Sequence, residues 1–352
     1  MCIRDSIDAI ISENNQIKKN LNKLKGKEKG MAHRDMGKNW KEIRLMEKQI
    51  IEEVISDAEI ILATCVGVAH KSIADKRFPI VLIDEATQAT ETATLVPIVR
   101  GARQLILIGD HKQLPPTIIS KRAEESGFAR SLFERLIDAG IEPFMLRTQY
   151  RMHPCISEFP SARFYDGLLE NGISQDERKA PAGFIWPNWD LPVAFIPLDS
   201  EEGTDVENTS RFNSEEAVKV VDVVQKLLES FEITPNQIGV ITPYNGQVRL
   251  LTDHFDSLGG TGTDEPFQGL EIRSVDGYQG REKEVIIFST VRANQNGELG
   301  FLTDKRRLNV ALTRAKRGLI IIGNPNTLKR DETWNSWLEW IEERELMAWH
   351  YR

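Results

Sequence analysis

The apolar run of residues 80–83 (Ile-Val-Leu-Ile), followed at once by Asp84 and Glu85, constrains the fold of this chain most strongly. Four consecutive β-branched or aliphatic residues predict a strand that is buried on both faces of a parallel sheet. The two carboxylates then stand at the carboxyl edge of that sheet, where open α/β folds bind their ligands. There the Asp can hold a nucleotide-bound Mg²⁺, and the Glu can orient or deprotonate an attacking water. Alone the pattern is weak, because acidic residues also end strands as ordinary solvated turns.

A second strand and loop follow at short spacing. Residues 104–108 are mostly aliphatic and lead into residues 109–116, with the sequence Gly-Asp-His-Lys-Gln-Leu-Pro-Pro. Gly109 permits a sharp exit from the strand, and the paired prolines stiffen the segment beyond it. Gln113 carries both a donor and an acceptor on this rigid loop, which suits a side chain that senses a γ-phosphate. An ordinary polar turn is the alternative, and it loses weight because this loop follows the acidic one so closely.

Three later segments carry further motifs in order. They are residues 146–154 (Leu-Arg-Thr-Gln-Tyr-Arg-Met-His-Pro), 274–282 (Ser-Val-Asp-Gly-Tyr-Gln-Gly-Arg-Glu) and 306–315 (Arg-Arg-Leu-Asn-Val-Ala-Leu-Thr-Arg-Ala). Together with the two loops, they resemble the ordered motifs of superfamily 1 nucleic-acid helicases. Within that superfamily, residues 164–167 (Phe-Tyr-Asp-Gly) and 300–302 (Gly-Phe-Leu) most resemble the up-frameshift RNA helicases of nonsense-mediated decay.

The resemblance implies an α/β fold of the P-loop NTPase class with RecA-like parallel sheets, in one partial and one complete lobe. Alternation of strand and helix patterns also favours a parallel sheet covered on both faces. The implied domains are a helical insertion (1–58), the carboxyl-terminal half of RecA-like domain 1 (59–143), RecA-like domain 2 (144–330) and a carboxyl-terminal helix (331–352).

Periodicity places the elements of the second domain. Strands are expected at residues 193–196, 238–241, 285–288 and 319–322. A helix should start after Asn213 as N-cap, with Glu216 three residues later, in a relative of the capping box. Its apolar stripe is Ala217, Val220, Val221, Val224, Leu227 and Leu228. A closing amphipathic helix follows, in which Trp334, Trp337, Leu338 and Ile341 are expected to pack rather than to stack on bases.

The first domain has weaker signals. Residues 1–58 look like two charged helices that are broken near residues 26–37, and the second carries apolar residues at helical spacing from Ile43 to Val54. Residues 60–64 then predict a strand. A further helix signal covers residues 131–136, and Gly140 fits its end.

The motifs assign roles in ATP hydrolysis, which depends mostly on positioning and charge neutralisation. Asp84 would bind Mg²⁺, Glu85 would act on the attacking water, and Gln113 would contact the γ-phosphate. Arg151 and Arg314 come from the other domain, so they would reach the phosphates when the cleft closes. Their planar guanidinium groups spread positive charge over several oxygens.

The resemblance also implies binding residues. Gly280 would offer its backbone N–H to phosphate, Glu282 would accept hydrogen bonds from the ribose hydroxyls, and Tyr150 would pack beside the base. Hydroxyl and amide side chains at strand ends can bind a sugar-phosphate backbone without reading its sequence. The predicted contacts to single-stranded RNA or DNA are Thr64, Thr242, Tyr244 and Asn245.

Composition sets further bounds. The chain has 352 residues, 40% of them hydrophobic, so two domains with full cores are possible. No apolar stretch reaches the length of a membrane span, and the scattered Cys2, Cys65 and Cys155 fit reduced thiols. Net charge is −8, yet residues 18–48 carry 11 basic and 4 acidic side chains, which could attract phosphates or simply form a solvated face. The resemblance implies a monomer that meets mRNA surveillance factors in the cytoplasm or also in the nucleus.

The phosphate-cradling pattern Gly-x-x-x-x-Gly-Lys-Ser/Thr is absent, since residues 37–39 (Gly-Lys-Asn) lack the upstream Gly and the hydroxyl. In the family this loop precedes the helical insertion, so the chain is expected to be a carboxyl-terminal fragment that binds nucleotide poorly by itself. The second motor domain should fold alone, whereas the first should expose apolar edges.

Three functions stay open at this point. The first is an ATP-dependent RNA helicase, for which the resemblance implies 5′→3′ movement. The second is a DNA or RNA/DNA-hybrid helicase of the related termination and replication branches, where the Gln-Leu-Pro-Pro of residues 113–116 is common. The third is a non-motor binding module, against which the intact Asp84, Glu85, Gln113, Arg151 and Arg314 argue.

Overall fold

The computed structural model describes residues 3–205 and 210–351. Contacts divide the chain into two compact units. Unit 1 takes in the chain up to Gly109 together with Ser120–Leu132, and unit 2 takes in Asp110–Ile119 and everything from Phe133 onward. The domain limits expected after residues 58, 143 and 330 stay predictions. No helix among the described residues combines the length and apolar character needed to cross a bilayer.

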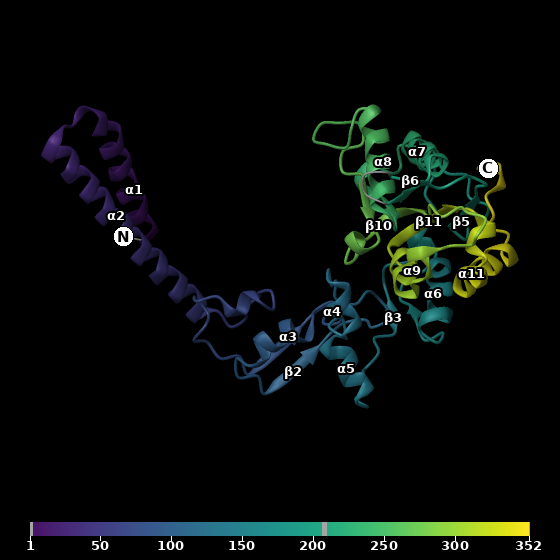
Figure 1. Cartoon of the computed structure of the whole chain (residues 1–352), viewed down its shortest axis with the longest axis horizontal. Helices are drawn as coiled ribbons and strands as arrows, with labels where there is room; N and C mark the ends of the chain where they lie inside the picture. Colours follow the sequence, from purple (N-terminus) through teal and green to yellow (C-terminus); the bar gives the residue numbers. More distant parts are fainter. Residues whose placement is uncertain (1–2, 206–209, 352) are drawn as a thin grey trace. The chain divides into compact units, whose positions relative to one another are not determined.

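Unit 1 begins with two helices that pack side by side (Figure 1). Its elements are α1 Ile3–Asn20, a 3₁₀ turn Leu21–Lys23, α2 Gly26–Asp57, a 3₁₀ turn Gly67–Ala69, β1 Ile80–Ile83, α3 Glu91–Ile98, β2 Gln104–Leu107 and α4 Lys121–Glu125. Asn39 Nδ2 donates to Asn14 Oδ1 over 3.1 Å, and Ile43 is buried. The hydrogen bond joins α2 to α1.

The break between the two helices is shorter than the predicted one near residues 26–37. The chain turns only at residues 24–25, and α2 continues through Gly30 and Gly37. Of these glycines, only Gly26 has a left-handed φ, +53°, and a glycine that keeps helical dihedrals weakens a helix without ending it. The apolar face of α2, predicted to dock from Ile43 to Val54, is also shorter than predicted, because Ile51 and Val54 are exposed.

The sheet of unit 1 consists of the parallel strands β1 and β2. Val81 and Ile83 are buried, whereas Ile80 and Leu82 are 59% and 56% exposed. The prediction that this strand is buried on both faces is therefore wrong, because the two-stranded sheet is covered on one face only. The apolar exposure expected for the first domain is confirmed.

Residues 60–64 do not form the predicted strand. No strand pairing in the described part of the chain includes them, and Ile60 and Leu62 are 80% and 92% exposed. A strand requires a neighbour that completes its backbone hydrogen bonds, and local β-branched character alone does not supply one.

Unit 2 is a three-layer α/β structure. Its helices are α6 Pro154–Phe164, α7 Ser214–Glu229, α8 Asn245–Ser257, α9 Lys305–Leu312, α10 Pro325–Leu328 and α11 Glu332–Glu343, and α5 Leu132–Asp138 starts at the unit boundary. Its strands are β3 Thr148–Gln149, β4 Glu170–Asn171, β5 Val193–Pro197, β6 Gly203–Thr204, β7 Arg211–Phe212, β8 Ile238–Thr242, β9 Glu271–Ser274, β10 Lys283–Ser289 and β11 Ala315–Gly323. Five 3₁₀ turns lie at Asp176–Arg178, Pro235–Gln237, Asp276–Tyr278, Gly300–Thr303 and Trp349–Tyr351.

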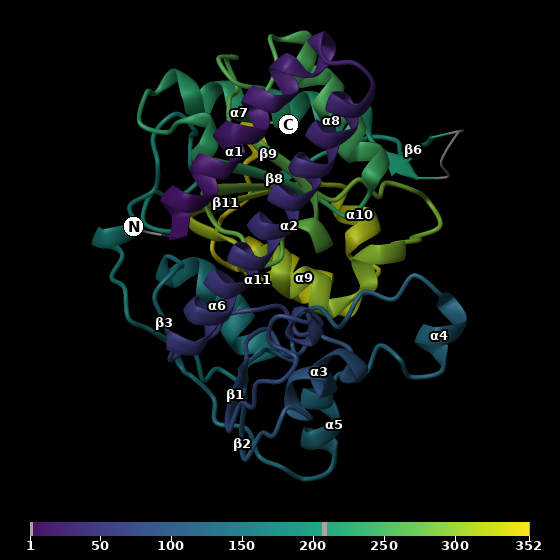
Figure 2. The same cartoon turned by 90° about the vertical axis from the view of Figure 1, so that its left-hand side faces the viewer.

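The main sheet has the order β5-β11-β10-β8-β9, and all its pairings are parallel. Figure 2 shows α7 and α8 on one face and α6, α9 and α11 on the other. Successive residues of β5 alternate between the two cores: Phe195 packs with Trp334 and Trp337, and Ala194 packs with Val220. The predicted α/β class with parallel sheets is confirmed, as are four of its strands and both amphipathic helices. The edge strand β9 was not predicted, since its sequence Glu-Ile-Arg-Ser is largely polar.

The start of α7 differs from the expected capping box. Asn213 caps the helix as predicted, since its Oδ1 accepts from Glu216 N over 3.1 Å. The Glu216 side chain does not accept from the Asn213 backbone N–H, as a capping box requires, although its Oε1 accepts weakly from Asn213 Nδ2 over 3.5 Å. It is fully buried and accepts from Ser289 Oγ over 2.6 Å and from Val291 N over 2.9 Å, while Asn213 N donates to Gln247 Oε1. Glu216 therefore ties α7 to the end of β10.

This buried carboxyl makes the stability of the chain depend on pH. Burial raises the pKa of Glu216 from its ordinary 4.5 to about 7. The folded chain thus keeps a proton that the unfolded chain releases, so the contribution is full below pH 4.5 and is lost as pH rises through about 7. Raising the pH from about 5 to about 8 should lower the free energy of unfolding of the wild type by on the order of 2–3 kcal/mol more than that of Glu216→Gln. Urea denaturation at each pH measures this difference. A pH-independent difference between the two chains would contradict this.

Candidate nucleotide and nucleic-acid sites

The turn after β1 holds the two predicted carboxylates of unit 1 in solvent. Asp84 Oδ1 accepts from Glu85 N over 2.9 Å, and Glu85 adopts a left-handed φ of 50°. Such a conformation costs a residue other than glycine on the order of 1 kcal/mol and is found mostly at functional sites. Both side chains are exposed at the carboxyl edge of β1, where an oxygen ligand for a cation is accessible.

The loops after β1 and β2 touch directly. Ala86 N donates to Ile108 O over 2.8 Å. At Gly109, an added Cβ would stand 3.0 Å from both the backbone N and Cγ2 of Thr87. A side chain at this position would press on Thr87, so a glycine suits the sharp exit of the second loop from its strand.

Beyond Gly109, the predicted sensing loop belongs to unit 2. Asp110 Oδ2 accepts from Gln113 Nε2 over 2.8 Å and from Tyr165 OH over 2.6 Å. Burial, and next the Asp110 carboxylate, raise the pKa of Tyr165 far above its usual value, so this hydroxyl remains a donor. Leu114 is inserted into the core of unit 2 and is 3% exposed. The loop is thus anchored on both sides of Gln113.

Arg314 contacts this loop from the end of α9. Its Nη2 donates to Gln113 Oε1 over 3.1 Å and to Thr313 Oγ1 over 3.0 Å, and its Nε donates to Val310 O over 3.0 Å. The side chain is buried, at 2% exposed. Two residues predicted to meet the γ-phosphate are therefore in direct contact, although they lie 201 positions apart.

Arg151 and Glu282 form an ion pair, with Arg151 Nε 2.5 Å from Glu282 Oε2. Arg151 Nη1 also donates to Thr313 O over 3.1 Å, next to Arg314. Lys316 Nζ lies 3.0 Å from Glu282 Oε1. Although burial opposes it, hydrogen bonds from Arg151 and Lys316 hold the pKa of Glu282 below its usual value. The predicted ribose acceptor is thus ionised and already shared by two cations.

The two remaining nucleotide residues are open to solvent. Tyr150 is 66% exposed, and its ring covers Gly172, where an added Cβ would lie 2.3 Å from Tyr150 Cε1. Gly280 has a left-handed φ of +73°. The exposed ring can pack beside a base, and the glycine backbone can approach a phosphate closely.

The predicted residues of unit 2 divide between opposite edges of its sheet. Glu282 and Arg314 directly precede β10 and β11, at the amino edge. Thr242, Tyr244 and Asn245 end or follow β8, at the carboxyl edge. Parallel strands keep these two edges apart, so the residues predicted to bind nucleotide and those predicted to bind nucleic acid lie at different edges of the sheet.

A cavity of about 180 Å³ lies at the carboxyl edge, lined by Ser210, Pro243, Tyr244, Asn245, Ser274, Asp276, Phe301 and Arg307. Asn245 is exposed there, and Tyr244 contributes to the wall although it is only 6% exposed. Thr242 is fully buried, because β8 is a central strand, so its side chain offers no surface to a nucleic acid in this structure. In unit 1, exposed Thr64 accepts from Gly67 N over 3.0 Å.

Two family models, each described as an AAA domain, match residues 2–121 and 128–326. The second match alone covers more than half of the chain. The chain belongs to the AAA domain family. The predicted resemblance to superfamily 1 helicases of the up-frameshift type is confirmed by its relatives.

Three relatives of this AAA domain chain show how similar it is to known helicases and regulators of nonsense transcripts. The regulator of nonsense transcripts 1 homolog of Drosophila melanogaster is 41% identical over 98% of the chain. The ATP-dependent helicases NAM7 of Saccharomyces cerevisiae and upf1 of Schizosaccharomyces pombe are each 43% identical, over 93% and 84% of it. The chain spans 30%, 33% and 32% of these three relatives.

Several polar residues near the cavity had no sequence signal. Glu202 and Arg292 form a buried ion pair of 2.9 Å, and neither lies in a motif. Glu216 was assigned to a helix cap instead of the core. A charged residue soon after a buried strand, as Arg292 comes three residues after the end of β10, is the pattern that could have drawn attention to this pair.

Proposed function

We propose that this chain forms part of an ATP-driven helicase motor that moves along single-stranded RNA. The hydrogen bond between Arg314 and Gln113 carries the proposal, because it joins a guanidinium group to the loop that would detect the γ-phosphate. The names of the relatives, which include ATP-dependent helicases, support it. Movement 5′→3′, a monomeric state, a cytoplasmic location and mRNA surveillance partners belong to the same proposal.

Asp84 would hold Mg²⁺, which neutralises charge on the transferred phosphoryl group. The donor set fits this ion, since Mg²⁺ is commonly bound by one or two carboxylates with waters and substrate phosphates. Among the described residues, no group of three or more His, Cys, Asp or Glu side chains is arranged to hold a metal ion. Glu85, exposed beside Asp84, would accept a proton from the attacking water.

Arg314 would stabilise the charge that develops on the phosphoryl oxygens. Its hydrogen bonds to Val310 O and Thr313 Oγ1 fix the guanidinium before the substrate arrives, and preorganised donors contribute most to such stabilisation. Arg151, tied to Thr313 by its Nη1, would act beside it. The exposed Tyr150 would pack beside the base, and Gly280 and Glu282 would bind phosphate and ribose.

Glu85→Gln tests the proposal in the natural full-length protein that carries this chain. We expect turnover of ATP to fall by about 100-fold or more, because the amide cannot accept the proton. ATP affinity should stay within about twofold, since the exposed side chain supports no neighbour whose loss would disturb the fold. RNA-stimulated phosphate release and nucleotide binding are the measurements.

Glu53→Gln, on exposed α2, is the matched control and should leave turnover unchanged. Unwinding of matched RNA and DNA duplexes with 5′ or 3′ tails separates an RNA helicase from a DNA helicase and fixes the polarity. Retained turnover in Glu85→Gln would remove this residue from its role, and wild-type protein that unwinds neither duplex would refute the motor.

A further inference from the structure

The carboxyl edge of the main sheet contains a topological switch point between β8 and β10. The chain leaves β8 for the outer strand β9, whereas it leaves β10 for β11 on the opposite side. Because these connections diverge, a crevice forms outside the carboxyl ends of the two strands, and α/β sheets bind ligands in such a crevice. Tyr244 follows β8 and Arg292 follows β10, so both lie at this place.

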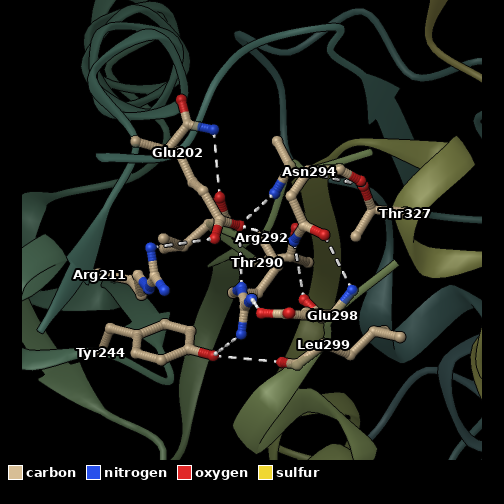
Figure 3. A network of polar contacts seen from close by, with 12 residues as sticks. Glu202, Arg211, Tyr244, Thr290, Arg292, Asn294, Glu298, Leu299 and Thr327 are labelled. Carbon is tan, nitrogen blue, oxygen red and sulfur yellow. Dashed lines mark hydrogen bonds and ion pairs between the residues drawn. The ribbon is translucent and has the colours of Figure 1, made fainter. Parts of the chain in front are cut away.

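Arg292 contacts Tyr244, which lines the cavity at this edge, and its guanidinium group is buried, the side chain being 6% exposed. Figure 3 shows the fork reaching several partners at once. Its Nε donates to Glu202 Oε2 over 2.9 Å, and its Nη1 donates to Tyr244 OH over 3.2 Å. Tyr244 OH in turn donates to Leu299 O over 3.2 Å. Arg292 thus links the loops that follow β5, β8 and β10.

Glu202 is engaged through both oxygens, with Oε1 3.5 Å from Arg211 Nη1 on β7 and Oε2 held by the loop after β10. Its Oε2 also accepts from Ala293 N over 2.8 Å and from Asn294 Nδ2 over 3.0 Å. A buried ion pair of this kind adds little net stability, because desolvation offsets most of the attraction. The ion pair does fix the direction of the hydrogen bonds that Arg292 donates, since its planar guanidinium sets where each N–H points.

The backbone before Arg292 is strained in a way that aims this side chain. Val291 has a φ of 69°, a rare conformation for a β-branched residue. Its N–H donates to Glu216 Oε2 over 2.9 Å, and its carbonyl accepts from Asn213 Nδ2 over 3.2 Å. Strain of this type persists only where buried partners impose it, and it is concentrated at working sites.

The segment above Arg292 is shaped by the same contacts. At Gly300, an added Cβ would stand 2.6 Å from Arg292 Nη1 and 2.7 Å from Tyr244 OH, so the segment rests directly on both side chains. The next residue, Phe301, packs its ring 5.6 Å from that of Tyr244 and remains 54% exposed. An exposed ring on a rigid support is the surface on which unpaired bases stack.

The cation nearest this ring is already neutralised. Arg307 lies over Phe301 at 5.2 Å, but its guanidinium is 3.2 Å from Asp276 Oδ1 and 2.9 Å from Asp304 Oδ2. The cavity wall therefore offers a stacking surface more than a phosphate-binding charge.

We propose that Arg292 is a positioning residue for single-stranded nucleic acid: held by Glu202, it fixes Tyr244 and the Gly300–Phe301 segment as a wall on which an unpaired base stacks. This inference rests on the function proposed above and adds the residues that shape its nucleic-acid site.

Arg292→Gln and Tyr244→Phe test it in the natural full-length protein, with a fluorescent single-stranded RNA as the probe. Each variant should weaken RNA binding by about tenfold, the loss of roughly one stacked base. The double variant should bind no more weakly than either single one, because both changes break the same hydrogen bond. The slope of log Kd against log salt should stay that of the wild type, since no phosphate contact is lost. KM for ATP should also be unchanged, because the nucleotide residues lie at the other edge of the sheet.

Arg249→Gln is the matched control. Arg249 pairs with Asp205 and so also joins α8 to the segment after β5, but it does not touch the wall, and its loss should leave RNA binding unchanged. Unaltered affinity in the test variants, additive losses, or an equal loss of ATP affinity would each overturn the proposal. If Arg292→Gln does not fold, Tyr244→Phe, which removes one oxygen atom, decides alone. Wild-type protein that binds no RNA would instead refute the proposed function.

Discussion

Arg314→Lys is expected to lower the rate of ATP hydrolysis by about 10³-fold in the natural full-length protein. Lysine keeps the charge but has no planar fork. It therefore cannot donate at the same time to Val310 O, Thr313 Oγ1 and Gln113 Oε1, as Arg314 does. Single-turnover hydrolysis at saturating ATP and RNA is the measurement.

Arg306→Lys is the matched control for that experiment. Arg306 lies on α9, the helix that ends two residues before Arg314, and its Nη2 is 2.6 Å from Glu134 Oε1, but its side chain is 37% exposed. This replacement should change turnover by less than about threefold, as expected for a surface ion pair. Turnover of Arg314→Lys within tenfold of the wild type would show that Arg314 holds the loop without acting on the phosphates. Gln113→Ala, which removes the same contact from the other side, should lower turnover too.

Trp334→Ala should give the largest loss of stability in unit 2. Trp334 is fully buried between α11 and the sheet, its ring stacks on Phe288 at 6.0 Å, and its Nε1 donates to Leu302 O over 2.9 Å. Removing a buried Trp costs about 3–5 kcal/mol through lost burial and the cavity left behind. Urea denaturation of the 352-residue chain, followed by circular dichroism, measures the effect on its transition.

Trp189→Ala serves as the comparison, because Trp189 is 54% exposed. Its loss should shift the same transition by less than about 1 kcal/mol. Equal shifts for both tryptophans would mean that α11 does not close the core of unit 2.

The strands of unit 2 were predictable because β5, β8, β10 and β11 are apolar on both faces. Their burial follows from local composition, which the sequence displays directly. In unit 1 the same pattern at β1 gave a wrong prediction, because burial of the second face depends on neighbouring elements and not on the strand itself. The prediction of a strand at residues 60–64 was wrong for the same reason.

The candidate site was predictable residue by residue but not contact by contact. Motif order named Gln113 and Arg314, yet their hydrogen bond joins positions 201 residues apart. Glu202 and Arg292 lie 90 residues apart and have no local pattern at all. Glu216 lies three residues after the N-cap, and this spacing predicted a hydrogen bond to the Asn213 cap. In the fold, its carboxylate is instead buried and accepts from Ser289 on β10. Pairs of this kind depend on the tertiary structure, so no local stretch of sequence predicts them.

Helix α9 runs from one working edge of unit 2 to the other. Arg307, in its first turn, lines the carboxyl-edge cavity, and Arg314 follows two residues after its last turn. Eight residues span about 12 Å, and the helix is buried from Leu308 to Leu312. Under the proposed function, a displacement of Arg307 by nucleic acid at the cavity would reach Arg314 through this one short, tightly packed helix.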